Sequence, residues 1–215
     1  MPFWAYLLAA AGGYLLGSVP TGYLVGRARG VDLRTSGSGN IGATNTLRVL
    51  GWRAGVFVLA VDALKGLAAV WLGGRGWPGA AGAEVAAREP LALVAGVAAI
   101  LGHNYTCWLG FKGGKGIATS AGVLLGWMPA ALGWCFLVWA GVFGLSRYVS
   151  LASICAAAAL PVAAWLTGSG PWRTGIGLVL GALAIFKHRA NIRRLLDGTE
   201  HRWSRSASTP RSTLS

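Results

Sequence analysis

The chain has 215 residues, of which 54% are hydrophobic and only 12% are charged. A soluble domain usually has about 25% charged residues, so this composition excludes an ordinary water-soluble protein. The net charge of +13 does not support binding to nucleic acid, because no soluble basic domain is available to carry that function. We assign the positive charge to membrane topology and to attraction by anionic lipid.

Long apolar blocks that are nearly free of charge follow one another along the chain. They cover residues 3–26, 56–74, 91–110, 117–146, 150–168 and 174–186. Several of them reach the ~20 residues that a helix needs to cross a bilayer. The first block lacks the basic stretch of a signal peptide, since its first charged residue is Arg27, so we expect a retained span.

The basic residues between the blocks predict the orientation, because cytoplasmic loops are enriched in Lys and Arg. Residues 27–53 hold five arginines and one aspartate, whereas residues 74–90 hold two arginines and two glutamates. The loop after the third block holds Lys112 and Lys115, and the tail from residue 187 onward holds seven basic and two acidic residues. We therefore expect the N-terminus outside and the C-terminus in the cytoplasm.

The block at residues 117–146 must cross the membrane an even number of times to agree with this orientation. As a helix its 30 residues would measure about 45 Å, against about 30 Å of hydrocarbon. Met128–Pro129 lies near its middle and marks the expected turn between two short helices, with a re-entrant pair as the alternative. The sequence thus predicts an all-α polytopic membrane protein with seven transmembrane helices. Residues 1–200 would form one membrane domain, and residues 201–215 a polar, disordered cytoplasmic tail.

The first polar segment, "SGSGNIGATNTLRVLG", covers residues 36–51. Its glycines and serines are typical of a backbone nest for an anion, and a helix beginning near Thr44 would add its positive end. A flexible turn is the alternative. The candidate binding residues of this segment are Gly37, Ser38, Gly39, Asn40, Thr44, Asn45 and Arg48.

The second polar segment, "GHNYTCWLGFKGGKGIATS", covers residues 102–120. It is not a Walker A loop, because Leu109 stands where the first glycine is needed and Gly116 follows Lys115. The alternative for its lysines is that they only set the topology. The glycines would open the backbone and the lysines would supply charge for phosphate, so the candidates are His103, Lys112, Gly113, Gly114, Lys115 and Gly116.

Two further polar segments lie on the expected cytoplasmic side. Ser150 and Ser153 are three residues apart and share a helical face, although small hydroxyl residues also serve helix packing in membranes. In "FKHRANIRRLLDGTE", residues 186–200, the side chains of His188, Asn191 and Arg194 would share another face. A basic segment that binds lipid headgroups is the alternative for this part.

Two charged residues, Asp62 and Lys65, lie inside the second apolar block. Each costs about 2.5–3.5 kcal/mol at the bilayer centre on insertion scales, so a mutual pair is the simplest arrangement, with a role in the site as the alternative. The six acidic residues form no cluster typical of metal ligands, and no G-x-S-x-G nucleophile elbow is present. These observations favour a metal-free membrane site for phosphorylated ligands.

The segments "GSGNIGATNTLR", "GHNYTCWLGFKGGKGIAT" and "HRANIRRLLDGTE" resemble, in this order, the three motifs of the bacterial acyl-phosphate:glycerol-3-phosphate acyltransferases, the PlsY family. The resemblance runs from about residue 18 to residue 200. Its departure is "NYTCW" after His103, where an aromatic residue and proline are expected.

The resemblance implies seven transmembrane helices in the bacterial inner (plasma) membrane, with the motifs meeting at the cytoplasmic face. It implies transfer of a fatty acyl group from acyl phosphate to the 1-hydroxyl of glycerol 3-phosphate, giving lysophosphatidate and inorganic phosphate in phospholipid biosynthesis. No metal or cofactor is implied, and the functional partner would be the enzyme that supplies acyl phosphate. Composition alone does not decide the acyl donor.

The resemblance also implies residue roles. Ser38, Arg48, Lys115, His188 and Asn191 would be catalytic, with either His188 or the leaving phosphate as the base. Ser150, Ser153, Arg194 and Glu200 would join the glycine and lysine residues in binding substrate, and Arg194 and Glu200 would also hold the third motif in place. The competing function is a transporter or channel for phosphate or glycerol phosphate, which clustering of the polar residues at one face disfavours.

Overall fold

The computed structural model describes residues 1–76 and 85–203, and within these ranges every regular element is helical. The chain divides into two compact units, Met1–Leu132 and Gly133–Ser215. The all-α architecture predicted from the apolar blocks is confirmed for the described residues. The expected outer loop falls largely in residues 77–84, outside the described residues.

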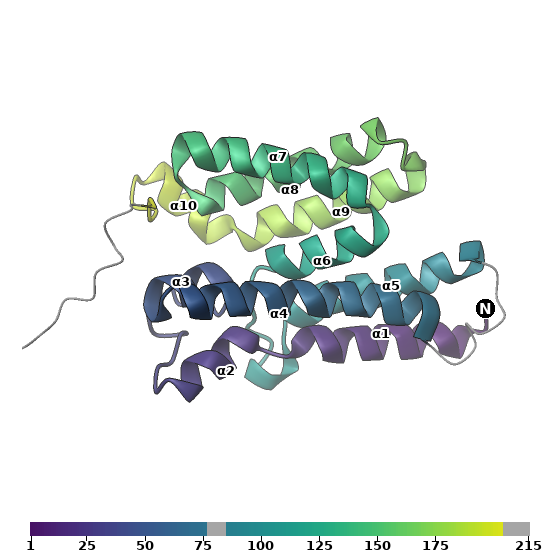
Figure 1. The fold of residues 1–215 in the computed structure, drawn as a ribbon, viewed down its shortest axis with the longest axis horizontal. Coiled ribbons are helices and arrows are strands. Elements are labelled where there is room, and N and C mark those ends of the chain that lie inside the picture. The colour runs from purple at the N-terminus through teal and green to yellow at the C-terminus, as the bar shows by residue number, and fades with distance from the viewer. Residues whose placement is uncertain (77–84, 204–215) are drawn as a thin grey trace, which may run out of the picture. The chain divides into compact units, whose positions relative to one another are not determined.

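The first unit contains three long helices that run side by side, α1 (Phe3–Ser18), α4 (Trp52–Trp71) and α5 (Val85–Asn104) (Figure 1). Helix α1 lies along α5 with almost no space between the backbones. A Cβ atom on Gly13 would overlap the backbone of Ala95, and one on Gly17 would overlap that of Ala99. Small residues at such crossings allow helices to pack by close van der Waals contact, which is the main source of association inside a membrane.

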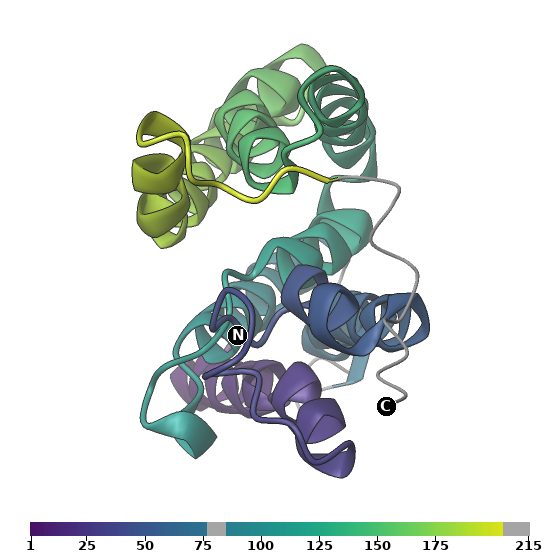
Figure 2. The ribbon, with the colours of Figure 1, turned by 90° about the vertical axis from the view of Figure 1, so that its left-hand side faces the viewer.

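Shorter elements complete the first unit. Helix α6 (Ile117–Trp127) packs against α4, a π-helical turn follows α4 at Leu72–Gly76, and a 3₁₀ turn follows α5 at Cys107–Leu109. Helices α2 (Thr21–Ala28) and α3 (Ala43–Leu50) lie at the end of the unit where α1 finishes, and Figure 2 looks onto this end.

The first apolar block, predicted as a retained span, is broken into α1 and α2 at Val19–Pro20. Pro20 has no backbone N–H and its ring crowds the preceding turn, so a continuous helix is interrupted at this point. The break leaves the Val19 carbonyl outside the helical hydrogen-bond pattern, where the Lys65 ammonium donates to it at 2.9 Å.

The second unit consists of α7 (Pro129–Ser146), which begins just before the unit boundary, α8 (Val149–Leu166), α9 (Gly170–Lys187) and the short α10 (Arg189–Leu196). Helices α8 and α9 pack side by side (Figure 1), with Gly181 of α9 against the Ala157 carbonyl of α8. The turn between α7 and α8 is tight, and Arg147 adopts a left-handed φ of 62° in it.

Among the residues that the structure describes, five helical segments are long and apolar enough to cross a membrane: Phe3–Ala28, Trp52–Arg75, Arg88–Leu109, Pro129–Ser146 and Val149–Leu166. The break predicted within residues 117–146 is confirmed, since α6 ends at Trp127 and α7 begins at Pro129. Helix α6 has only 11 residues, about 16 Å, and so is shorter than a full span. The chain is an all-α polytopic membrane protein, and its seven crossings and orientation remain a prediction.

The start of the expected tail is held in place. The Trp203 N–H donates to the Arg147 carbonyl at 2.8 Å, and Arg202 Nε donates to the Ser146 carbonyl at 3.3 Å. Residues 201–203 thus lie along the α7–α8 turn, in contrast to the disorder expected for them. Residues 204–215, the rest of that tail, lie outside the described residues.

Candidate functional site

The Ser/Gly-rich segment before α3 is folded by the side chain of Asn45. Asn45 Oδ1 accepts the Ser38 N–H at 2.8 Å, and Asn45 Nδ2 donates to the carbonyls of Ser36 at 3.0 Å and Leu33 at 3.3 Å. Asn45 is only 2% exposed. Gly37 has a φ of +60°, and a Cβ there would overlap the Asn45 carboxamide. Asn45 therefore shapes this loop through contacts with the chain itself.

A second contact holds the same loop from its outer side. Arg34 donates from Nη2 to Asp32 Oδ2 at 2.6 Å, and its guanidinium lies 4.8 Å from the centre of the Tyr23 ring. The hydrogen bonds from Arg34, side chain first and then backbone, lower the pKa of Asp32 to about 2. Sequence reasoning did not select this pair, although Asp-x-Arg-Thr is a pattern that favours local turns.

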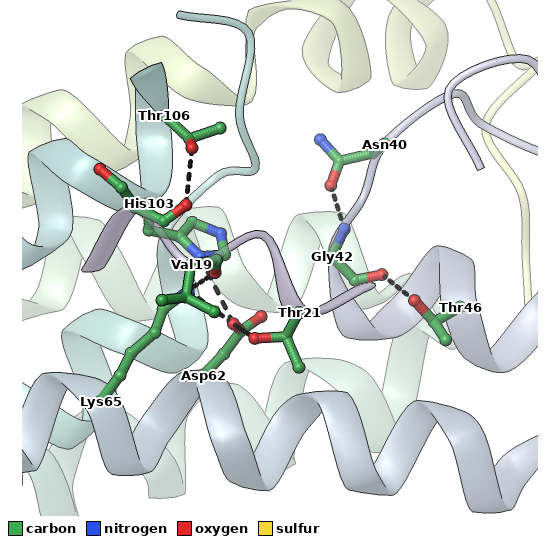
Figure 3. Close-up of polar contacts among 10 residues, drawn as sticks. Val19, Thr21, Asn40, Gly42, Thr46, Asp62, Lys65, His103 and Thr106 are labelled. Carbon is green, nitrogen blue, oxygen red and sulfur yellow. Dashed lines mark hydrogen bonds and ion pairs between the residues drawn. The ribbon is translucent and has the colours of Figure 1, made fainter. Parts of the chain in front are cut away.

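The helix predicted near Thr44 is confirmed as α3, which begins at Ala43. Asn40 Oδ1 accepts the Gly42 N–H at 2.9 Å just before it, and Thr46 donates back to the Gly42 carbonyl at 3.1 Å (Figure 3). Arg48 lies exposed in the last turn and Thr44 is exposed in the first. Ser38 is half-buried.

The glycine–lysine loop, residues 110–116, is fastened to the C-terminal end of α5. The Gly113 N–H donates to the Asn104 carbonyl at 3.2 Å, and the Gly114 N–H donates to the His103 carbonyl at 3.0 Å. A Cβ on Gly113 would overlap the His103 carbonyl, and one on Gly114 would overlap the His103 ring. These two glycines are therefore required by the close approach of the loop to α5.

These bonds correct the anion nests expected in both loops. The N–H groups of Gly113 and Gly114 are satisfied by α5, that of Ser38 by Asn45, and that of Gly39 by the Ser36 carbonyl at 3.1 Å. A nest needs N–H groups directed at the ligand, so these four positions do not supply one. The predicted side-chain donors for an anion, Ser38, Arg48, Lys112 and Lys115, stay a prediction.

The two lysines occupy different positions on the glycine–lysine loop. Lys112 is exposed, whereas Lys115 is half-buried. Gly116 follows in the left-handed region with a φ of +79°, and α6 then begins at Ile117. Lys115 therefore lies at the N-terminal end of a helix, where the helix dipole also favours an anion.

Asp62 and Lys65 form the pair expected from their spacing, and the pair extends to other helices (Figure 3). Lys65 Nζ lies 2.7 Å from Asp62 Oδ1, to which Thr21 Oγ1 also donates at 3.0 Å. His103 Nδ1 lies 3.7 Å from the same oxygen. Asp62, Lys65 and His103 are all buried, so His103 faces the protein interior.

In the second unit, Glu200 collects the polar residues of the third motif. Its Oε1 accepts from Ser150 Oγ at 2.8 Å and from Asn191 Nδ2 at 2.7 Å, and its Oε2 accepts from Arg194 Nε at 2.7 Å. Burial raises the pKa of Glu200, but the bonds from Asn191, Ser150 and Arg194 outweigh it and hold the pKa below its ordinary value of 4.5. Glu200 thus fixes the positions of the other three.

His188 lies at the junction of α9 and α10 and not on the face of a continuous helix, as had been predicted. Its ring is buried, and Nδ1 lies 2.8 Å from the Ala184 carbonyl. A carbonyl can only accept, so Nδ1 carries the proton and Nε2 is the basic nitrogen of the neutral ring. Ser153 is also buried; it donates to the Val149 carbonyl at 2.8 Å and accepts from Trp139 Nε1 at 3.2 Å.

Within residues 1–76 and 85–203 no group of three or more His, Cys, Asp or Glu side chains could hold a metal ion. The candidate residues of the first two motifs belong to the first unit, and Ser150, Ser153, His188, Asn191, Arg194 and Glu200 belong to the second.

The comparison with protein families is decisive at this point, because the family model for glycerol-3-phosphate acyltransferases matches residues 7–198. The chain belongs to this family. The glycerol-3-phosphate acyltransferase of Geobacter sulfurreducens is 45% identical over 197 residues, covering 92% of this chain and 97% of the relative. Glycerol-3-phosphate acyltransferase 2 of Moorella thermoacetica is 49% identical over 199 residues, with the same coverage of 92% and 97%.

The solved structures of PlsY, an integral membrane glycerol 3-phosphate acyltransferase, agree with this placement. Its glycerol 3-phosphate form is 40% identical to this chain with a TM-score of 0.83, covering 93% of this chain and 96% of PlsY. Its lysophosphatidic acid form is 39% identical with a TM-score of 0.80, covering 93% and 95%. The resemblance of the three motifs to the PlsY family is confirmed, and the chain is a member of an acyltransferase family.

Proposed function

We propose that this protein transfers a fatty acyl group from acyl phosphate to the 1-hydroxyl of glycerol 3-phosphate, in the first acylation step of phospholipid biosynthesis. The observation that carries the proposal is the 40% identity over 93% of the chain to PlsY, described in a glycerol 3-phosphate form and a lysophosphatidic acid form. These two compounds are the acceptor and the product of the proposed reaction.

In the proposed step the 1-hydroxyl oxygen attacks the acyl carbonyl carbon, and the bond from that carbon to the phosphate oxygen breaks. The products are 1-acyl-glycerol 3-phosphate and inorganic phosphate. Acyl phosphate is already activated, so neither a covalent enzyme intermediate nor a metal ion is needed. Positioning of the two substrates and stabilisation of the charge on the carbonyl oxygen supply the rate.

The polar residues of each unit have assigned roles in this scheme. In the first unit, the cations Arg48, Lys112 and Lys115 neutralise phosphate, and Ser38 orients the attacking hydroxyl. In the second unit, Asn191 and Ser150 are presented by Glu200, and they contact substrate together with His188. The hydroxyl proton passes either to His188 Nε2 or to the leaving phosphate. A His188→Ala variant that keeps most of its kcat would rule out the histidine base.

We also propose that the chain crosses the bacterial inner membrane seven times, with the N-terminus outside and the candidate residues at the cytoplasmic face. The two crossings beyond the five long segments would be α6 and α9. Membrane-impermeant labelling of single cysteines at positions 2, 112 and 203 in intact cells tests this. Labelling at position 2 alone is expected, and labelling at position 112 would contradict the orientation.

The decisive experiment is a donor comparison with purified protein in lipid. Labelled glycerol 3-phosphate is supplied with either palmitoyl phosphate or palmitoyl-CoA, in the presence of EDTA. We expect lysophosphatidate from the phosphate donor only, and its loss in Lys115→Ala. Product from palmitoyl-CoA alone would contradict the proposal that acyl phosphate is the acyl donor. No product from either donor would redirect the work to anion uptake in vesicles, while dependence on added metal would contradict the metal-free mechanism.

A further inference from the structure

The buried Asp62–Lys65 pair lies where several segments of the first unit meet. Asp62 and Lys65 come from α4, Thr21 is the first residue of α2, and Val19 belongs to the break after α1. Asp62 Oδ1 accepts from Thr21, while Lys65 donates to the Val19 carbonyl, so the pair joins α4 to the interrupted first helix from both sides (Figure 3). Both side chains are almost fully buried, at 2% and 5% exposure.

One branch of contacts leads from Asp62 to the glycine–lysine loop. Asp62 Oδ1 lies 3.7 Å from His103 Nδ1 near the end of α5. His103 is in turn in direct contact with the glycine–lysine loop. Its carbonyl accepts the Gly114 N–H at 3.0 Å, and its ring occupies the space that a side chain on residue 114 would need. The position of the His103 ring therefore limits how closely Gly114, which lies between Lys112 and Lys115, approaches α5.

A second branch leads from Asp62 to the Ser/Gly-rich segment. Thr21, which donates to Asp62, is followed by Gly22, and a Cβ on Gly22 would overlap the Ile41 carbonyl and lie 3.0 Å from Thr46 Oγ1. Ile41 closes the loop that carries Ser38, and Thr46 lies in α3 beside Asn45. The start of α2 is thus packed directly on the second candidate loop.

We propose that Asp62 is a positioning residue that sets the geometry of both substrate-binding loops, through His103 for the glycine–lysine loop and through Thr21 for the Ser/Gly-rich segment. The inference rests on the proposed function for its kinetic consequences. Asp62 itself does not touch substrate in this scheme. Its negative charge orients the His103 ring with Nδ1 toward α4, which leaves the opposite edge of the ring against Gly114.

A buried ion pair could instead serve packing alone, and the two roles predict different outcomes. A pair that only fills space can often be replaced by apolar residues of similar volume without loss of stability. The double variant Asp62→Leu/Lys65→Met therefore keeps a folded protein in either case. If Asp62 positions the loops, the double variant stays folded but loses affinity for glycerol 3-phosphate. If the pair only packs, the double variant keeps both its stability and its affinity for glycerol 3-phosphate.

The first readout is steady-state kinetics together with the thermal unfolding midpoint. For Asp62→Asn we expect KM for glycerol 3-phosphate to rise about tenfold or more, because the carboxamide cannot hold the His103 ring by charge. Asp62→Glu should recover part of this affinity. The matched control is Glu89→Gln, since Glu89 is another carboxylate of the first unit, and its Oε1 accepts a hydrogen bond from Trp127 Nε1 at 3.0 Å. It should leave KM unchanged.

Coupling through His103 is tested by combining variants. If Asp62 acts on the glycine–lysine loop through His103, the KM of Asp62→Asn/His103→Gln should equal that of His103→Gln within about twofold, because the contact is already lost in the single variant. Additive increases in KM would overturn the proposed route.

A second readout does not depend on catalysis. Trypsin cleaves after Lys112 and Lys115, so its rate on protein in lipid nanodiscs reports how firmly the glycine–lysine loop is held. We expect faster cleavage at these sites in Asp62→Asn and the wild-type rate in Glu89→Gln. Wild-type KM and wild-type cleavage in Asp62→Asn would overturn the inference, whereas inactive wild-type enzyme with faster cleavage in the variant would overturn only the proposed function.

Discussion

The side-chain oxygen of Asn45 lies 2.8 Å from the backbone nitrogen of Ser38 and accepts its N–H. The bond spans seven residues and closes the loop on which the Ser38 hydroxyl is presented. Both N–H groups of the Asn45 carboxamide donate to carbonyls of the same loop. Asn45, which was predicted to bind substrate, therefore fixes the loop that carries Ser38, another predicted site residue. A role in shaping the loop and a role in contacting substrate make different predictions for substitutions of Asn45.

Replacement of Asn45 by aspartate tests this relationship. The aspartate keeps the acceptor for Ser38 but loses the two donors, and it places a charge beside the carbonyls of Leu33 and Ser36. We expect kcat/KM to fall by about tenfold or more, because a displacement of about 1 Å at a substrate-positioning group can cost as much as a hundredfold. Steady-state assays with purified protein measure the change.

The control for this variant is Thr35→Ala, which removes a single exposed hydrogen bond to the Asp32 carbonyl in the same loop. Exposed bonds of this kind contribute little, so its kcat/KM should match the wild type. Wild-type kcat/KM in Asn45→Asp would contradict the role of Asn45 in shaping the loop.

The two glycines of the glycine–lysine loop should differ in their tolerance of a methyl group. A Cβ on Gly113 overlaps a backbone carbonyl that cannot move without breaking α5, whereas one on Gly114 overlaps a side chain. We expect Gly113→Ala to lower activity more than Gly114→Ala, with both far below the wild type. Gly133→Ala is the matched control, since its Cβ would meet nothing within 4 Å. Equal activity in all three variants would remove the packing explanation for the glycines.

Much of the fold could be predicted because membrane helices leave strong signals in sequence. The long apolar blocks indicated the helices, and Pro129 indicated the break between α6 and α7. The break at Val19–Pro20 was missed because the apolar run continues across it. A hydropathy pattern does not show that one backbone N–H is missing at Pro20. The consequence of the break is visible only in the structure, where Lys65 donates a hydrogen bond to the Val19 carbonyl.

The candidate site was predicted less completely, for a different physical reason. Residue type indicates which groups can bind phosphate, but not which of them are already bonded within the chain. The glycines at 113 and 114 suit a nest by composition, and the structure assigns their N–H groups to α5. The pairing of Asp62 with Lys65 followed from their spacing in one helix, whereas the approach of His103 required the packing of two helices.

The Glu200 cluster should contribute strongly to the stability of the second unit. Glu200→Gln removes the charge that faces Arg194 and replaces one acceptor by a donor, leaving a buried donor without its partner. We expect the free energy of unfolding to fall by about 2 kcal/mol or more, as measured by thermal or denaturant unfolding in detergent. Because Arg194 loses its charged acceptor, and Ser150 and Asn191 would share the oxygen of a neutral amide in place of a carboxylate, activity should fall as well.

Asp197→Asn provides the control for this change. Asp197 lies in the same segment, but its ion pair with Arg193 is 3.9 Å long and highly exposed, with side-chain exposures of 87% for Arg193 and 57% for Asp197. Exposed pairs of this kind contribute about 0–1 kcal/mol. If Asp197→Asn destabilised the protein as much as Glu200→Gln, the effect would come from general charge and not from the buried cluster.

The lowered pKa of Glu200 also predicts how this contribution depends on pH. A carboxyl group whose pKa is lower in the folded state than in the unfolded chain binds fewer protons when folded, so it stabilises the fold at pH values above its ordinary value of 4.5. As the pH falls below 4.5 and through the folded-state pKa, the carboxylate becomes protonated and the stabilisation disappears. The difference in unfolding midpoint between wild type and Glu200→Gln should therefore be constant from pH 8 to about pH 5 and shrink below it.

Asp197→Asn, which keeps Glu200, should follow the wild-type curve throughout. A difference that grows on acidification would mean that Glu200 is protonated in the folded protein, and the hydrogen bonds from Asn191, Ser150 and Arg194 would then not be holding a carboxylate.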